Sequence, residues 1–167
     1  MRNFIRKDQK TCLFPEYSCQ ENEMIGIGCG ARSYRNNVHY SRKYAVEEKN
    51  INKIIDEYLI ERDFSVGSFG YLLNEDELKR RYILKSILKV TGLDIEDYTS
   101  KFKTSPLTDF KEMQFLLEND FLLQKKSRLY PTEKGLMYSD AIGNLFISGE
   151  VKRKVVTYKD DLIQMES

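Results

Sequence analysis

A glycine-rich segment contains the residues best suited to ligand contact. Residues 26–34 read G-I-G-C-G-A-R-S-Y, which places Gly26, Gly28 and Gly30 at alternate positions. Because glycine lacks a Cβ, its main-chain amides can lie close to a ligand. The G-x-G-x-G spacing matches neither the dinucleotide-binding fingerprint nor the phosphate-binding loop that ends in Lys-Ser/Thr. The glycines alone favour a tight, closely packed strand exit over a ligand-binding turn.

A basic segment follows these glycines. Residues 32–43 contain no acid, and their basic side chains are Arg32, Arg35, His39, Arg42 and Lys43. Arginine binds carboxylates through two hydrogen bonds, and the interleaved tyrosines add donors. The segment therefore predicts either an anion clamp, with Arg32 and Arg35 as candidates, or a solvated loop that pairs with acids elsewhere. His39 is the sole histidine, and we expect it to be structural.

Three cysteines, Cys12, Cys19 and Cys29, are the remaining candidates for site chemistry. Their spacings lack the compact C-x2-C pattern of zinc and iron–sulfur sites. An odd number of cysteines also does not suggest a disulfide framework. We therefore expect reduced thiols and no metal site in this chain, with metal binding by the cysteines as the less favoured alternative.

Hydrophobic periodicity indicates the elements that position these residues. We expect a short buried strand over residues 24–28, a helix over 46–60 and an extended arm over 64–73. A helix over 74–91 has Asn74 as N-cap, Glu77 as the capping-box acid and Gly92 as its end.

The order of the later elements is that of a winged-helix domain. Further helices are expected over residues 95–102 and 107–119, then a hairpin over 121–130, then a helix capped by Thr132. Residues 108–120 contain Lys111 against four acids, a net charge of −3 that opposes phosphate contacts. The hairpin does contain Lys125, Lys126 and Arg128. We therefore predict a winged-helix scaffold without nucleic-acid binding.

Composition indicates a soluble globular protein. The chain of 167 residues has 41% hydrophobic and 32% charged residues and a net charge of +1. No apolar run approaches the roughly 20 residues that cross a bilayer, and the N-terminus has no secretory signal. We expect a cytoplasmic protein without a membrane partner.

Several segments together resemble coproporphyrinogen III oxidase-like radical S-adenosylmethionine (SAM) proteins, and most closely a branch whose substrate is unassigned. They span much of residues 17–150, and they are Y-S-C-Q at 17–20, M-I-G-I-G-C-G-A-R-S-Y at 24–34, H-Y-S at 39–41, R-R-Y-I-L-K-S-I-L at 80–88, G-L-D at 92–94, L-Y-P-T-E-K-G-L at 129–136 and S-D-A-I-G at 139–143. The segments occur in the same order as in the family.

The resemblance implies the C-terminal part of an oxygen-independent coproporphyrinogen III oxidase-like enzyme, with a domain that helps to cover the substrate. In that family, backbone at the position of Gly30–Arg32 lies beside the SAM adenosyl group. The resemblance thus implies SAM contact at Gly28, Gly30, Ala31 and Arg32, and Arg35 remains the candidate for a substrate anion. A [4Fe–4S] cluster cleaves SAM reductively in the family, and the substrate is a tetrapyrrole.

The chain departs from this family at its cluster motif. The C-x3-C-x2-C motif is absent from all 167 residues, so we expect no catalytic residue in this chain. We expect the rest of the barrel, in the same polypeptide or in trans, to hold the cluster. The expected fold is α+β. It comprises a glycine-rich strand and loop arm at the barrel edge (1–45), a mainly helical winged-helix-like domain with a small hairpin (46–150) and a polar tail (151–167). The alternatives are a free-standing winged-helix module for nucleic acid or protein, and a remnant of the enzyme.

Overall fold

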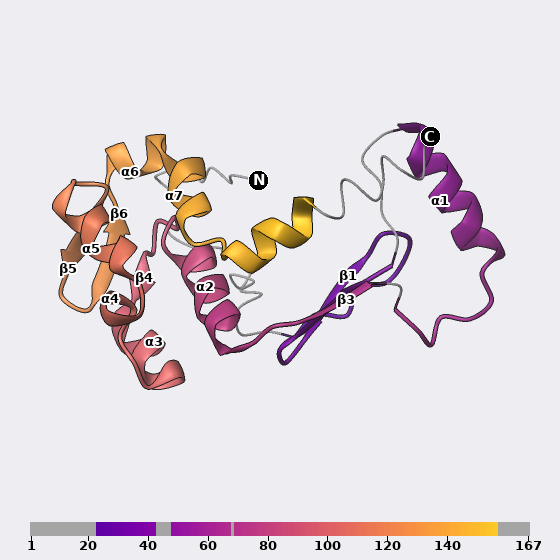
Figure 1. Ribbon diagram of the computed structural model, residues 1–167, viewed down its shortest axis with the longest axis horizontal. Coiled ribbons are helices and arrows are strands. Elements are labelled where there is room, and N and C mark those ends of the chain that lie inside the picture. Colours follow the sequence, from indigo (N-terminus) through magenta and orange to yellow (C-terminus); the bar gives the residue numbers. More distant parts are fainter. Residues whose placement is uncertain (1–22, 43–47, 68, 157–167) are drawn as a thin grey trace, which may run out of the picture. The chain divides into compact units, whose positions relative to one another are not determined.

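The computed structural model describes residues 23–42, 48–67 and 69–156, which form an α+β fold (Figure 1). The chain divides into two compact units, Met1–Leu72 and Leu73–Ser167, called here the N-terminal and C-terminal units. The sequence placed this division at residues 45 and 46. The first long helix and the strand after it therefore group with the glycine-rich segment instead of with the winged-helix elements.

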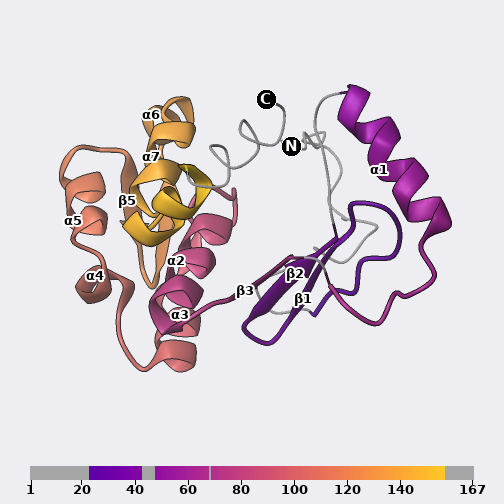
Figure 2. The same cartoon turned by 45° about the vertical axis from the view of Figure 1, so that its right-hand side comes forward.

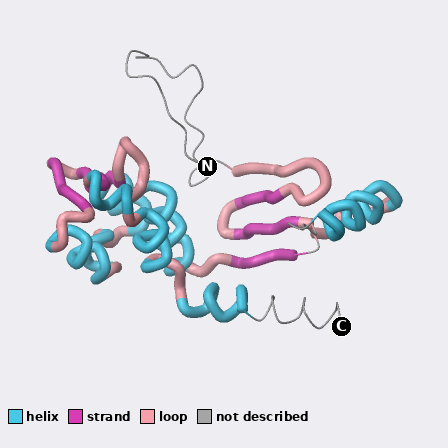
Figure 3. The backbone as a smooth tube through the Cα atoms, turned by 90° about the horizontal axis from the view of Figure 1, so that it is seen from above, coloured by secondary structure: helices cyan, strands magenta, loops and turns pink. Residues whose placement is uncertain are grey.

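A three-stranded antiparallel sheet forms the centre of the N-terminal unit (Figure 3). Its strands are β1 (Arg32–Arg35), β2 (Val38–Ser41) and β3 (Phe69–Leu72), in the order β1-β2-β3. Tyr34 pairs with His39, and His39 pairs with Tyr71. The turn between β1 and β2 contains Asn36 at a φ of 53°, a conformation that asparagine tolerates better than most residues.

The predicted buried strand over residues 24–28 is wrong. Of these residues, only Met24 pairs with a strand, through a single bridge to Tyr34. The side chains of Ile25 and Ile27 are exposed. An apolar run is ambiguous by itself, because the same residues can also face solvent or a partner.

Helix α1 (Glu48–Ile60) confirms the helix that was expected over residues 46–60, and its first predicted residues lie outside the described ranges. Arg42 holds the loop that follows this helix. Its Nη2 donates to the carbonyl oxygens of Asp63 at 2.9 Å and Val66 at 3.3 Å, and its guanidinium lies 4.4 Å from the centre of the Phe64 ring. The Phe64 ring in turn packs edge-on against Tyr58 of α1.

Helix α2 (Glu75–Ser86) begins as predicted and ends earlier than predicted. The Asn74 side chain accepts a hydrogen bond from the amide of Glu77 at 2.9 Å, which confirms the N-cap. The helix stops at Ile87, so Gly92 does not cap it. Gly92 instead has a φ of 71° in the next turn, where a Cβ would lie 2.4 Å from the carbonyl oxygen of Leu129.

The following elements have the winged-helix order (Figure 2). They are β4 (Leu93–Asp94), α3 (Ile95–Phe102), α4 (Pro106–Asp109), α5 (Lys111–Glu118), β5 (Leu122–Lys125) and β6 (Arg128–Pro131). The strands form an antiparallel sheet in the order β4-β6-β5, with the β5–β6 hairpin as the wing. Ser105 and Pro106 start the extra turn α4, and this divides the helix that was expected over residues 107–119.

The last helices are α6 (Glu133–Met137) and α7 (Ser139–Leu145), and residues 149–156 are also helical. The predicted polar tail therefore begins with helix over residues 151–156, and its remainder lies outside the described ranges. Thr132 caps α6 as expected, through a 3.0 Å hydrogen bond from the amide of Gly135. At Gly135, a Cβ would lie 2.1 Å from the carbonyl oxygen of Phe121, so the backbones touch there.

The two units differ in what they bury. The C-terminal unit has a continuous core of Tyr82, Ile83, Ile87, Leu93, Tyr98, Phe110, Met113, Leu116, Leu122, Leu129, Ile142 and Phe146. Among the described residues of the N-terminal unit, only Ser33 is buried. The C-terminal unit thus has the core of an independent domain, whereas the described part of the N-terminal unit does not.

Candidate functional site

The three glycines of the 26–34 segment have different structural roles. At Gly26, a Cβ would lie 2.4 Å from the carbonyl oxygen of Arg32, and the Gly26 amide donates to the hydroxyl of Ser33 at 3.0 Å. This glycine therefore allows two backbone segments to pack closely. The close-packing interpretation thus holds for Gly26, and it does not hold for Gly28, where a Cβ would meet nothing within 4 Å.

The next part of the segment forms an open turn. Gly28 has a φ of 111° and Gly30 a φ of 68°, both in the region that glycine adopts most readily. The Ala31 amide donates to the carbonyl oxygen of Gly28 at 3.2 Å and closes the turn. A Cβ at Gly28 would meet no atom within 4 Å, and the Ile27 side chain beside it is 93% exposed. A planar ligand or a neighbouring strand has room to approach this backbone.

Arg32 and Arg35 do not converge on one anion. Both lie in β1, and residues three apart in a strand point to opposite faces of the sheet. The Arg35 guanidinium lies 3.9 Å from the carboxylate of Glu23, and both side chains are mainly exposed. The structure therefore offers two separate arginines, one on each face, in place of a two-arginine clamp.

Two other basic residues of this segment, His39 and Arg42, have structural contacts, and Lys43 lies outside the described ranges. The ring of His39 stacks on Tyr34 with 4.2 Å between ring centres, and Arg42 holds the loop after α1. The sequence indicated a structural role for His39, but it did not indicate one for Arg42. Nothing in the local sequence relates Arg42 to a loop more than twenty residues away.

The cysteines do not form a cluster site in the part of the chain that the structure describes. Cys29 is a free, exposed thiol whose Sγ lies 3.8 Å from the carbonyl oxygen of Ile54, and Cys12 and Cys19 lie outside the described ranges. Among the described residues, no group of three or more His, Cys, Asp or Glu is placed to hold a metal ion. The donor set does not fit a [4Fe–4S] cluster, which needs three thiolates near one another.

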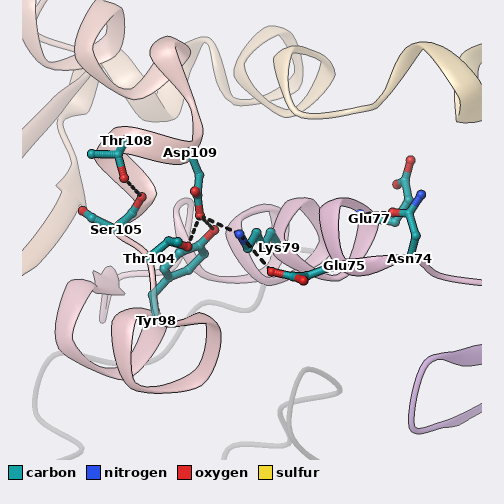
Figure 4. A network of polar contacts seen from close by, with 9 residues as sticks. All are labelled: Asn74, Glu75, Glu77, Lys79, Tyr98, Thr104, Ser105, Thr108 and Asp109. Atoms are coloured by element: carbon teal, nitrogen blue, oxygen red, sulfur yellow. Dashed lines mark hydrogen bonds and ion pairs between the residues drawn. The ribbon is translucent and has the colours of Figure 1, made fainter.

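A polar network in the C-terminal unit was missed by the sequence analysis (Figure 4). Asp109 Oδ2 accepts hydrogen bonds from Tyr98 at 2.7 Å and Thr104 at 2.6 Å, and lies 3.3 Å from the Lys79 ammonium. Lys79 also pairs with Glu75 at 3.2 Å. The network joins α2, α3 and α4, which meet only in the folded chain.

The network shifts the pKa of each central member. Burial alone would raise the pKa of Asp109, but donors from Thr104, Tyr98 and Lys79 outweigh it and hold that pKa below its usual value. For Lys79, burial lowers the pKa, and the pairs with Glu75 and Asp109 reverse this and raise it. Burial, then the hydrogen bond to Asp109, raises the pKa of Tyr98. Asp109 is thus stable in its ionised form and Tyr98 in its neutral form, so the network has a structural role. We call the contacts of Asp109 with Tyr98, Thr104 and Lys79 the latch.

Some charged side chains of the winged-helix elements form ion pairs within the unit, so the exposed charge differs from the charge that the sequence predicts. Asp109 is only 17% exposed and pairs with Lys79, so it does not add to the charge of the exposed helix face. In the wing, Arg128 pairs with Asp94 at 2.7 Å and donates to the carbonyl of Thr91. Lys125, the last residue of β5, and Lys126, in the turn after it, are both exposed. The helix remains acidic, although less so than the sequence suggested.

Comparisons with protein-family models, with curated proteins and with solved structures yield no match for this chain. In the described ranges, no helix has the length and apolar character needed to cross a bilayer. Function is therefore inferred from the residues and their geometry.

Proposed function

We propose that this chain forms the C-terminal, substrate-covering part of a radical SAM oxidoreductase related to oxygen-independent coproporphyrinogen III oxidase. The C-terminal unit is the cover, and the N-terminal unit adds the edge of the barrel. The substrate class is a tetrapyrrole, whose carboxylates suit arginine. In this proposal the chain is not catalytic alone, because its 167 residues lack the C-x3-C-x2-C motif that would hold the cluster.

The apolar surface of the N-terminal unit carries this proposal. Its exposed large apolar side chains are Ile25, Ile27, Val38, Ile51, Ile55, Leu59, Ile60, Phe64, Val66, Phe69 and Leu72. Burying one such side chain contributes about 1.5–3 kcal/mol, which this unit forgoes while it has no partner. Apolar surface of this extent on a small unit is typical of an interface. The rest of a barrel is the partner that the segment resemblance indicates.

The turn at residues 28–31 supports the SAM assignment. Its positive φ angles and the free space at Gly28 would let the Gly30 and Ala31 backbone lie against an adenosyl group. Arg32 would lie next to that backbone, while Arg35 on the opposite face would meet a different anion. SAM, when bound to a cluster in the rest of the barrel, supplies the radical chemistry.

The test measures iron and SAM cleavage with a matched pair of variants. The tagged chain is expressed in its source organism and purified without oxygen, and iron per chain and 5′-deoxyadenosine formation are measured. Ile27→Glu places a carboxylate in the proposed apolar interface and should lower both by about tenfold or more. Val90→Glu is the control, because Val90 is 90% exposed and lies in the C-terminal unit.

Two results would contradict the proposal. One is a purified chain that carries no iron and forms no 5′-deoxyadenosine from SAM. The other is equal iron and equal 5′-deoxyadenosine formation in the Ile27→Glu and Val90→Glu proteins.

A separate experiment tests the two arginines. The affinities of Arg32→Ala and Arg35→Ala for SAM and for a tetrapyrrole are measured, and unchanged affinity for both ligands would reject an anion-binding role.

The winged-helix order favours a second candidate, a free-standing binding module for nucleic acid. Lys125 and Lys126 at the tip of the wing are the exposed cations that a duplex backbone would meet. A gel shift with salt titration tests it, because phosphate contacts weaken steeply as salt rises. Binding that weakens steeply with salt would support this candidate. The acidic α5 instead leads us to expect no binding to duplex DNA at physiological salt, a result that would reject the candidate.

A further inference from the structure

An aromatic patch lies on the surface of the C-terminal unit. The Phe115 and Phe121 rings stack with 6.3 Å between centres, and Tyr138 meets Phe121 edge-on at 5.6 Å. Phe115 is 52% exposed and Tyr138 is 54% exposed, whereas Phe121 is partly buried against the core of this unit. Met137 and Leu136, which precede Tyr138, are also exposed. We call Phe115, Phe121 and Tyr138, whose rings contact one another, the aromatic patch.

The patch has the composition of a protein-docking surface. Exposed aromatic rings and methionine are enriched at the centres of protein interfaces, and they are costly to leave in water as a group. Phe115 lies in the middle of α5, the helix that a DNA-binding winged-helix domain inserts into the major groove. A phenylalanine at this position, between Glu112 and Glu118, does not suit a phosphate backbone.

The charges around the patch define its partner. The ionisable side chains on the segments that bear it are Lys111, Glu112, Glu118, Asp120, Glu133, Lys134 and Asp140, five acids against two bases. Lys134 Nζ lies 4.4 Å from the centre of the Phe121 ring and donates to the carbonyl of Asn119 at 2.8 Å, and it keeps its positive charge, so the five acids still exceed the two bases by three. The rim therefore has a net negative charge, and a complementary partner is positive.

We infer that the aromatic patch docks a protein segment that presents aliphatic side chains flanked by lysine or arginine. The aliphatic side chains pack on Phe115, Phe121 and Tyr138, and the cations meet the acidic rim. This inference goes beyond the proposed function, because the patch belongs to the C-terminal unit alone and involves neither SAM nor a cluster.

The test titrates the full chain with two labelled synthetic peptides. Both repeat leucine at helical spacing; one has lysine at its remaining positions and the other has glutamate. By fluorescence anisotropy, the lysine peptide should bind and weaken with added salt, and the glutamate peptide should not bind. Phe115→Ser and Tyr138→Ser should each weaken binding by about tenfold, as expected for central aromatic anchors. Val90→Ser, at a more exposed apolar position outside the patch, should retain the affinity.

A charge variant keeps the test decisive if an aromatic variant fails to fold. Glu118→Lys leaves all three rings in place and should weaken the lysine peptide while allowing the glutamate peptide to bind. Equal binding of both peptides to the wild-type chain would overturn the inference, as would an equal loss in Val90→Ser. Self-association that Phe115→Ser abolishes would assign the patch to a second copy, and displacement by duplex DNA would assign it to nucleic acid; either result overturns the inference.

Discussion

Replacement of Asp109 by alanine should strongly destabilise the C-terminal unit. Asp109 accepts hydrogen bonds from Tyr98 and Thr104 and pairs with Lys79, whose side chain is only 13% exposed. Leaving the Tyr98 hydroxyl without its acceptor costs about 1–3 kcal/mol. Removing the charged acceptor of Lys79 costs about 1.5–3 kcal/mol, although Glu75 remains at 3.2 Å. The exposed Thr104 hydroxyl can turn to water and adds little, so the two costs sum to about 2.5–6 kcal/mol.

Urea unfolding of the intact chain at neutral pH measures this loss. Far-ultraviolet circular dichroism is the probe, because the chain has no tryptophan and the C-terminal unit is mainly helical. The matched control is Asp76→Ala, which removes a surface i,i+4 pair with Arg80 and should cost at most about 1 kcal/mol. Asp109→Asn keeps a neutral acceptor for Tyr98 and should lie between the two.

An Asp109→Ala midpoint equal to that of Asp76→Ala would refute the latch. It would mean that water replaces Asp109 without cost, and that α3 and α4 are held against α2 by apolar packing alone. A double-mutant cycle with Tyr98→Phe tests the same point. The latch predicts a clearly non-additive result.

The remaining predictions concern glycines, pH and one arginine. Gly135→Ala would place a Cβ 2.1 Å from the carbonyl oxygen of Phe121 and should lower the unfolding free energy by about 1–3 kcal/mol. Gly143→Ala, in α7, has room for a Cβ and should raise the unfolding free energy by up to about 1 kcal/mol. Because the folded-state pKa of Asp109 is depressed, its contribution to the unfolding free energy is present above about pH 4 and is lost as pH falls further. The difference in stability between wild type and Asp109→Asn should therefore narrow in thermal melts at acid pH. Arg42→Ala should free the loop over residues 61–67, which faster amide hydrogen exchange there would report, and unchanged exchange would contradict it.

The helices of the C-terminal unit were largely predictable, because their signals are local. Asn74 and Thr132 cap helices as expected. A cap needs only a side chain that accepts a hydrogen bond from a backbone amide two or three residues further on. The 95–102 helix and the hairpin were also found from periodicity and turn residues. The break between α4 and α5 was missed, because periodicity continues across it.

The N-terminal unit was predicted less well, for a physical reason. The run over residues 24–28 is apolar, and an apolar run predicts burial only where a core exists to receive it. Here Ile25 and Ile27 face outward, and the unit buries little of its own. The glycine segment likewise combined one closely packed glycine, Gly26, with two at positive φ, Gly28 and Gly30, and this difference depends on the folded backbone.

The amino-acid sequence by itself determined the α+β class, the helix caps, the wing and the position of the glycine turn. These depend on residues that are neighbours along the chain. Only the tertiary structure decided that Arg32 and Arg35 lie on opposite faces, that Asp109 is withdrawn from the surface by Lys79, and that Phe115 joins Phe121 and Tyr138. Each of these depends on the strand or helix geometry of the folded chain, or on elements that meet only when the chain folds, so the linear pattern alone did not reveal them.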